Sequence, residues 1–257
     1  MLNFSDRGIL LDIEGTTSAI AYVYDVMFPF ARNGLDAYLD RHWGEPGLAK
    51  VGDQIASDAG HASLDAWLRD APTGGGDAKA LVRGEVVRLM DGDVKATGLK
   101  QLQGLIWEDG FRSGELRAHV FPDVPPALAA WREAGIDLRV YSSGSVHAQK
   151  LFFGHSDAPG GNAGGNGGDL LPFFSGHYDT TTGGKREPTS YTKIAGDWGL
   201  PAAGVLFLSD VVAELDAARE AGMQTGLVVR EGNAPVEPGH GHAALTSFAE
   251  IELTPPA

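Results

Sequence analysis

Hydrophobic and polar positions divide the chain into two kinds of segment. Beyond Val120, short apolar runs that predict buried strands alternate with amphipathic stretches that predict helices, as is typical of a parallel α/β sheet. An apolar run near the N-terminus, residues 9–11, predicts a further strand that is buried on both faces of such a sheet. The later predicted strands are residues 136–141, 205–208 and 225–229. Predicted helices begin near Pro125, Val146, Pro188 and Val211.

Residues 19–116 show a different pattern, with apolar side chains at helical spacing and no strand-like alternation. The helical patterns cover residues 19–43, with Pro29 as a candidate break, and then 63–69, 78–90 and 99–111. Clusters of glycine and aspartate at 72–77 and 91–93 separate them as loops. We therefore predict an all-helical block inserted between the first strand and the remainder of an α/β domain.

Polar side chains follow the predicted strands directly. Asp12 and Glu14 come after the first strand, and in an extended segment both carboxylates would point to the same side. The second strand leads into SSGS at the start of a helix, which favours anion binding, and the third leads into Asp210. Ligands of open α/β sheets bind beyond the carboxyl ends of the strands. The side chains expected at this edge are Asp12, Glu14, Ser142, Ser143, Asp210 and, from a loop, Lys185.

This set predicts phosphoryl-transfer chemistry. Three carboxylates would repel one another, so a divalent cation is implied, and ligation by oxygen alone favours Mg²⁺. The serines and Lys185 would bind a phosphate group, and a neutralised phosphate can be attacked by a nearby carboxylate. Asp12 is the predicted nucleophile and would form an aspartyl-phosphate. Glu14 could protonate the leaving oxygen and then activate the water that hydrolyses the intermediate.

Composition excludes several other classes of function. The net charge of −14 over 257 residues argues against nucleic acid or an anionic membrane as a partner. The chain has no cysteine, which excludes disulfides, thiolate metal sites and cysteine nucleophiles. It has no basic segment followed by an apolar core at its N-terminus and no run of about 18 apolar residues, so we expect a cytoplasmic protein.

The motifs together resemble the haloacid dehalogenase superfamily. DIEGT at Asp12 corresponds to its first motif, SSGS to its second, Lys185 to its third and LSDVVAE to its fourth. The chain is most similar to the enolase-phosphatase family of methionine salvage. Glu14 stands where most phosphatases of the superfamily carry a second Asp. The further matching segments are LLDIEGTTS, FPFA, LQGLIWEDGFRSGEL, YSSGSVHAQKLFFGHS and SYTKIA.

The resemblance implies a Rossmann-like catalytic core of residues 1–18 and 117–257, with a helical cap of residues 19–116 and the active site between them. It implies a monomeric, Mg²⁺-dependent hydrolase, an acireductone synthase with one Mg²⁺ per subunit. Its small-molecule substrate would be 2,3-diketo-5-methylthiopentyl 1-phosphate, which is tautomerised to an enol phosphate and dephosphorylated to 1,2-dihydroxy-3-keto-5-methylthiopentene. The family's roles assign Mg²⁺ to Asp12, Glu14 and Asp210, and substrate contacts to Ser142, Ser143 and Lys185.

Several alternatives stay open at this point. Glu14 is an acid/base by the chemical argument and a metal ligand by the resemblance, and either Lys185 or Glu14 could be the base of the enolisation step. The chain could instead hydrolyse another small phosphate ester, or be a non-catalytic Mg²⁺-binding phospho-acceptor module. The glycine-rich segment 157–169 is interpreted as a surface loop. Four further polar or aromatic side chains are interpreted as packing residues rather than substrate contacts: Trp107, Glu108, Arg112 and His119.

Overall fold

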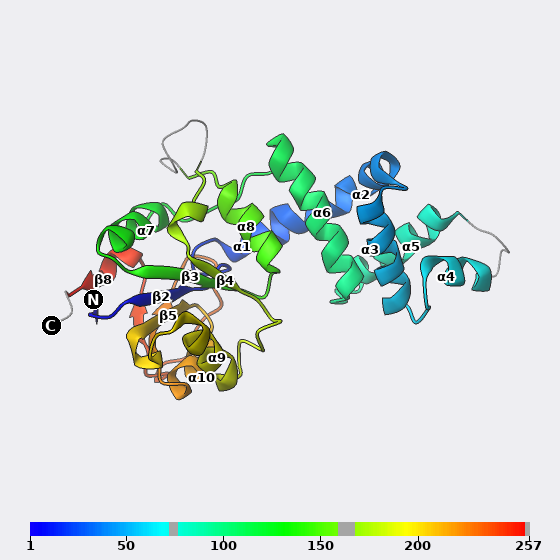
Figure 1. Cartoon of the computed structure of the whole chain (residues 1–257). Helices are drawn as coiled ribbons and strands as arrows, with labels where there is room; N and C mark the ends of the chain where they lie inside the picture. The colour runs from blue at the N-terminus through cyan, green and yellow to red at the C-terminus, as the bar shows by residue number, and fades with distance from the viewer. Residues whose placement is uncertain (72–76, 159–167, 255–257) are drawn as a thin grey trace. The chain divides into compact units, whose positions relative to one another are not determined.

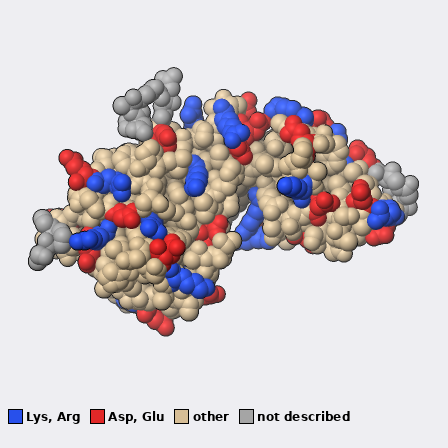
Figure 2. Space-filling model, in the orientation of Figure 1, with Lys and Arg blue, Asp and Glu red and all other residues tan. Residues whose placement is uncertain are grey.

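The structure is a computed structural model that describes residues 1–71, 77–158 and 168–254. Most of the two predicted glycine-rich loops, 72–77 and 157–169, lies outside the described residues. The chain divides into two compact units, one of Met1–Val23 with Leu116–Ala257 and one of Tyr24–Glu115. On the face drawn in Figure 2, Lys and Arg side chains lie among Asp and Glu side chains, so that face carries mixed charge.

The first unit contains a six-stranded sheet in which every neighbouring pair is parallel, and the α/β prediction is confirmed. The strand order is β4-β3-β2-β5-β6-β7. The strands are β2 (Gly8–Leu11), β3 (Asp137–Tyr141), β4 (Gly176–Tyr178), β5 (Val205–Ser209), β6 (Gln224–Val228) and β7 (Ala243–Leu245). β1 (Leu2–Phe4) and β8 (Ile251–Leu253) form a separate two-stranded parallel sheet. The apolar run of β2 is buried along its whole length because it lies between β3 and β5.

Helices cover both faces of this sheet (Figure 1). Leu10 and Phe207, which point to one face, belong to a core cluster with Ile194 and Leu215 of α9 (Pro188–Trp198) and α10 (Val212–Glu220). α7 (Val124–Glu133) contacts β3, and α8 (Val146–Gly154) contacts β4. Because consecutive side chains of a strand alternate between faces, both apolar layers come from the same short runs. The polar residues Asp12, Ser142 and Asp210 come directly after β2, β3 and β5, at the carboxyl ends of these strands.

The second unit consists of helices, as predicted. These are α2 (Phe28–His42), α3 (Pro46–Asp58), α4 (Leu64–Asp70), α5 (Ala78–Asp91) and α6 (Thr97–Ser113). Leu35, Ile55, Val86 and Leu102 are fully or almost fully buried in one shared core cluster of this unit. A three-residue helix, α1 (Ile20–Tyr22), and a π-helix (Val23–Met27) precede α2. None of the helices within the described ranges is long and apolar enough to cross a membrane.

Some elements differ from the sequence predictions. Pro29 does not end the helical segment: it lies in the first turn of α2, directly after the π-helix, and Met27 before α2 is itself helical. α3 was not predicted. Nor were the strands β1, β4, β7 and β8, each three residues long and partly exposed, which is too short for an alternating or continuous apolar pattern to appear.

Candidate active site

Asp12 follows β2, the central strand, and is 4% exposed. Its backbone N–H donates to the Leu208 carbonyl of β5 at 3.0 Å, and its Oδ1 accepts from the Ile13 N–H at 2.8 Å. The backbone N–H groups of residues 16–18 all donate to the Ile13 carbonyl, at 2.9–3.2 Å. A tight turn of residues 13–18 therefore follows Asp12, and within it Glu14 forms an isolated parallel bridge with Ser18.

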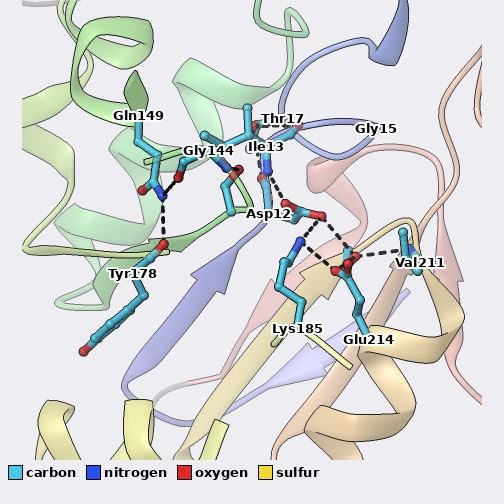
Figure 3. A network of polar contacts seen from close by, with 12 residues as sticks. Asp12, Ile13, Gly15, Thr17, Gly144, Gln149, Tyr178, Lys185, Val211 and Glu214 are labelled. Carbon is cyan, nitrogen blue, oxygen red and sulfur yellow. Dashed lines mark hydrogen bonds and ion pairs between the residues drawn. The ribbon is translucent and has the colours of Figure 1, made fainter. Parts of the chain in front are cut away.

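Lys185 connects two buried carboxylates (Figure 3). Its Nζ lies 2.7 Å from Asp12 Oδ2 and 2.7 Å from Glu214 Oε2, and its side chain is 9% exposed. The Ser209 hydroxyl lies 3.3 Å from Asp12 Oδ2 and 3.1 Å from Glu214 Oε2, and it accepts from the Val211 N–H. One ammonium and one hydroxyl therefore fix the carboxylate of Asp12 at the end of the sheet.

The pKa values of these groups follow from burial and from shared charge. Burial alone would lower the pKa of Lys185, but Asp12 and Glu214 outweigh it and raise that pKa above its usual range. Lys185 therefore stays an ammonium. Burial and the repulsion from Asp12 raise the pKa of Glu214 to about 7, because two carboxylates share one ammonium. Burial, again with Asp12, raises the pKa of Asp210 to about 7.

The predicted serine loop lies between β3 and α8. Ser142 is buried, donates its backbone N–H to the Tyr178 carbonyl at 3.2 Å, and accepts from the Gly144 N–H at its hydroxyl, also at 3.2 Å. Ser145 caps α8 by accepting from the Ala148 N–H. An open cavity of about 310 Å³ brings this loop together with Lys185 and Glu214. Its lining residues are Ser143, Thr180, Gly184, Lys185, Arg186, Glu187 and Glu214.

Asp210 and Glu14 complete the predicted acidic set. The repulsion from Asp12 and from Glu14 contributes to the raised pKa of Asp210, so the three carboxylates act on one another electrostatically. Within the part of the chain that the structure describes, no three His, Asp or Glu side chains are arranged so that they could hold a metal ion. Lys185 and the Ile13 N–H instead occupy both oxygens of Asp12. The donors are nevertheless all oxygens with excess negative charge, which fits a hard cation such as Mg²⁺.

Gly15 allows the first turn to approach Asp210 closely. Its φ is +72°, and a Cβ at this position would lie 2.2 Å from Asp210 Oδ2. We expect Gly15→Ala to displace Asp210 and to lower kcat about 10- to 100-fold, since a shift of about 1 Å in a catalytic group has effects of that size. Steady-state kinetics of the purified variant would measure this decrease in kcat.

Gly135→Ala is the matched control for this prediction. Gly135 has a φ of +82°, but no atom of the described residues lies within 4 Å of the place that its Cβ would take. The control therefore shares the backbone strain of Gly15→Ala without the collision. Equal loss of kcat in both variants would show that strain, and not displacement of Asp210, is the cause.

The structure also brings residues to the site that were not predicted. Glu214 lies four residues after Asp210, within the LSDVVAE segment and in the first turn of α10, where no local signal sets it apart from other charged residues. Arg230 Nε donates to the Thr16 carbonyl at 3.2 Å, and Asn233 Nδ2 donates to the Gly15 carbonyl at 2.9 Å. These two contacts join segments more than 200 residues apart, for which no local pattern exists.

The four residues interpreted as packing residues have contacts inside their own units. Trp107 Nε1 donates to the Met27 carbonyl at 2.8 Å, and Glu108 forms an ion pair with Arg112 at 2.5 Å. The His119 Nδ1 lies 3.3 Å from the Ala19 N–H, and its ring stacks on Tyr22.

Comparison with known proteins identifies the family. A model of the haloacid dehalogenase-like hydrolases matches residues 7–222. Enolase-phosphatase E1 of Pseudomonas aeruginosa strain UCBPP-PA14 is 46% identical over 245 residues, 95% of this chain and 97% of that protein. Enolase-phosphatase E1 of Stenotrophomonas maltophilia strain K279a is 45% identical over 251 residues, 96% and 99% of the two chains.

A solved structure agrees with these relatives. The crystal structure of the UTR4 protein from Saccharomyces cerevisiae superposes with a TM-score of 0.78 at 33% sequence identity, covering 96% of this chain and all of that one. The match extends over both compact units, because it covers nearly the whole chain. The protein therefore belongs to the haloacid dehalogenase-like hydrolases and, within them, to the enolase-phosphatase E1 family.

Proposed function

We propose that this protein is a bifunctional enolase-phosphatase of methionine salvage, an acireductone synthase. It converts 2,3-diketo-5-methylthiopentyl 1-phosphate, through the enol phosphate, to 1,2-dihydroxy-3-keto-5-methylthiopentene and phosphate. Relatives named enolase-phosphatase E1, similar over nearly the full length, support this activity. The observation that carries the chemistry is the buried contact of 2.7 Å between Lys185 and Asp12 at the end of the central strand.

In the phosphatase step, Asp12 attacks the phosphorus of the enol phosphate. A bond forms between an Asp12 carboxylate oxygen and phosphorus, and the bond from phosphorus to the enol oxygen breaks. Lys185 neutralises charge on the phosphoryl oxygens, and Ser142 and Ser143 hold the group in line. Water then attacks the aspartyl-phosphate, which releases phosphate and restores the carboxylate. Glu14 is assigned the proton transfers to the leaving oxygen and from this water.

In the enolase step, a proton is removed from the carbon beside a carbonyl, and negative charge develops on the carbonyl oxygen. Lys185 suits the stabilisation of that charge, because its raised pKa keeps it protonated. Because a protonated amine cannot accept a proton, Lys185 is a poor base for the enolase step. Of the two candidates for the base, we therefore favour Glu14.

Hydrolases of this family generally depend on magnesium. We assign one Mg²⁺ per subunit to the oxygens of Asp12, Glu14 and Asp210, although these side chains are not gathered into a metal site among the described residues. When bound, the ion would supply positive charge to the phosphoryl and enolate oxygens. We assign the role of cap to the helical unit and that of catalytic core to the sheet unit. We further propose a monomer that acts in the cytoplasm.

Incubation of the purified full chain with Mg²⁺ and the diketone phosphate tests this function. We expect Mg²⁺-dependent release of phosphate together with the ultraviolet absorbance of the enol product, and loss of both on chelation. Hydrolysis of generic phosphate esters but not of this substrate would favour a different phosphatase of the superfamily. The absence of hydrolysis of any ester, with phosphate or its analogues still bound, would favour the phospho-acceptor module.

A further inference from the structure

Gln149 is a buried amide that the proposed mechanism does not use. It lies in the first half of α8 and is 1% exposed. Burial of a glutamine is costly unless its donors and its acceptor are all paired. The hydrogen-bond partners of the Gln149 side chain therefore indicate which segments it holds in place.

Both donors of the amide go to backbone carbonyls that surround the serine loop. Nε2 donates to the Gly144 carbonyl at 2.8 Å and to the Tyr178 carbonyl at 2.8 Å (Figure 3). The Tyr178 carbonyl also accepts the N–H of Ser142 at 3.2 Å. One amide group is thus connected to the loop on both sides of Ser143, directly at Gly144 and through Tyr178 at Ser142.

The two carbonyls set the orientation of this amide, and its oxygen is paired with His177. The His177 Nδ1 lies 3.2 Å from Gln149 Oε1, and since an amide oxygen only accepts, the Nδ1 must carry the proton. Burial and the nearby charge of Lys150 lower the pKa of His177 to about 4, so the ring is neutral near pH 7. Nε2 is therefore held toward the two carbonyls and cannot exchange places with the oxygen without losing all three contacts.

We propose that Gln149 is a positioning residue that sets the place of Ser142 and Ser143 for phosphate binding. The inference rests on the proposed function, because it assigns those serines to the phosphate. Ser143 lines the cavity that also contains Lys185. With the carbonyl of Gly144 and the N–H of Ser142 both held, the loop presents the Ser143 peptide to that cavity in one conformation. Loss of the amide would let the loop leave this conformation, although Ser142, Ser143 and Lys185 themselves are unchanged.

Two substitutions at Gln149 and one matched control test this role. Gln149→Met keeps the length of the side chain but removes every hydrogen bond, and Gln149→Glu keeps its shape but replaces the donor by an acceptor. Gln224 is the control, because its Nε2 also donates to a backbone carbonyl, that of Ala203 at 2.9 Å. It begins β6, at the amino edge of the sheet, so Gln224→Met removes this bond and the bond to Asp6, both away from the site.

We expect Gln149→Met to raise KM for the phosphorylated substrate and the inhibition constant of inorganic phosphate in parallel, by about 10- to 100-fold. Gln149→Glu should do the same, whereas Gln224→Met should leave both constants unchanged. Circular dichroism and thermal unfolding establish that each variant is folded. If Gln149→Met does not fold, Gln149→Glu carries the test.

Two results would overturn the proposal. One is a wild-type KM and a wild-type inhibition constant in a folded Gln149 variant. The other is a loss of activity that is proportional to the loss of thermal stability and is the same in the Gln149 and Gln224 variants. If the wild-type protein hydrolyses no phosphate ester, the proposed function fails, and the affinity for inorganic phosphate, measured by calorimetry in wild type and variants, still decides the role of Gln149.

Discussion

Replacing Asp12 by asparagine should reduce phosphate release by at least about a thousandfold, because the amide cannot act as the nucleophile. The fold should persist. Asparagine has the same shape, and Lys185 keeps its second partner, Glu214, at 2.7 Å. Removal of one of two carboxylates that share an ammonium also relieves repulsion rather than creating it. The measurement is the turnover of the purified variant with the diketone phosphate, beside its thermal unfolding.

Asp6→Asn is a suitable control for this experiment. Asp6 stands before β2, at the opposite end of the same strand, and accepts a hydrogen bond from Gln224 at 3.1 Å. Its replacement should leave turnover unchanged. Turnover of Asp12→Asn within a few-fold of wild type would remove Asp12 as the nucleophile.

Lys185→Ala should affect both activity and stability. Loss of the ammonium leaves Asp12 and Glu214 buried and facing each other, and removal of one partner of a buried ion pair costs about 3–5 kcal/mol of unfolding free energy. The catalytic efficiency should fall at least about 100-fold, because no other cation among the described residues lies this close to Asp12. Denaturant unfolding and steady-state kinetics measure the two effects separately.

The double variant Lys185→Ala/Glu214→Gln separates the two roles of Lys185. Neutralising Glu214 removes the uncompensated charge, so much of the lost stability should return. Activity should not return, because the phosphate still lacks its cation. Recovery of activity together with stability would mean that Lys185 acts only through folding.

The strand ends could be predicted because burial on both faces forces continuous apolar runs, and polar residues can follow only where the strand leaves the core. Asp12 and Ser142 were located in this way, and the structure has them at the ends of β2 and β3. Lys185 has no such strand-end signal, because it lies in a loop. It was assigned to the site as the ammonium that a phosphate would need, and its contacts with Asp12 and Glu214 depend on the tertiary fold.

Other features could not be predicted from local pattern. The turn after Asp12 is closed by hydrogen bonds to the single carbonyl of Ile13, which no periodicity reports. Glu214 resembles any charged residue in a first helical turn, and its burial becomes visible only when α10 is packed beside Lys185. Gln149 likewise has the sequence context of an ordinary helix residue, and its role depends on two carbonyls from other segments.

The covalent step offers the most direct test of the account. Wild-type protein would be mixed with Mg²⁺ and substrate carrying a radiolabelled phosphoryl group, quenched in acid during the first turnover, and digested. We predict that the label is on the peptide that contains Asp12, and that Asp12→Asn protein, which still binds phosphate through Lys185 and the serine loop, carries none. Phosphate release in the first turnover without label on that peptide, or with label on another residue, would contradict phosphoryl transfer through Asp12.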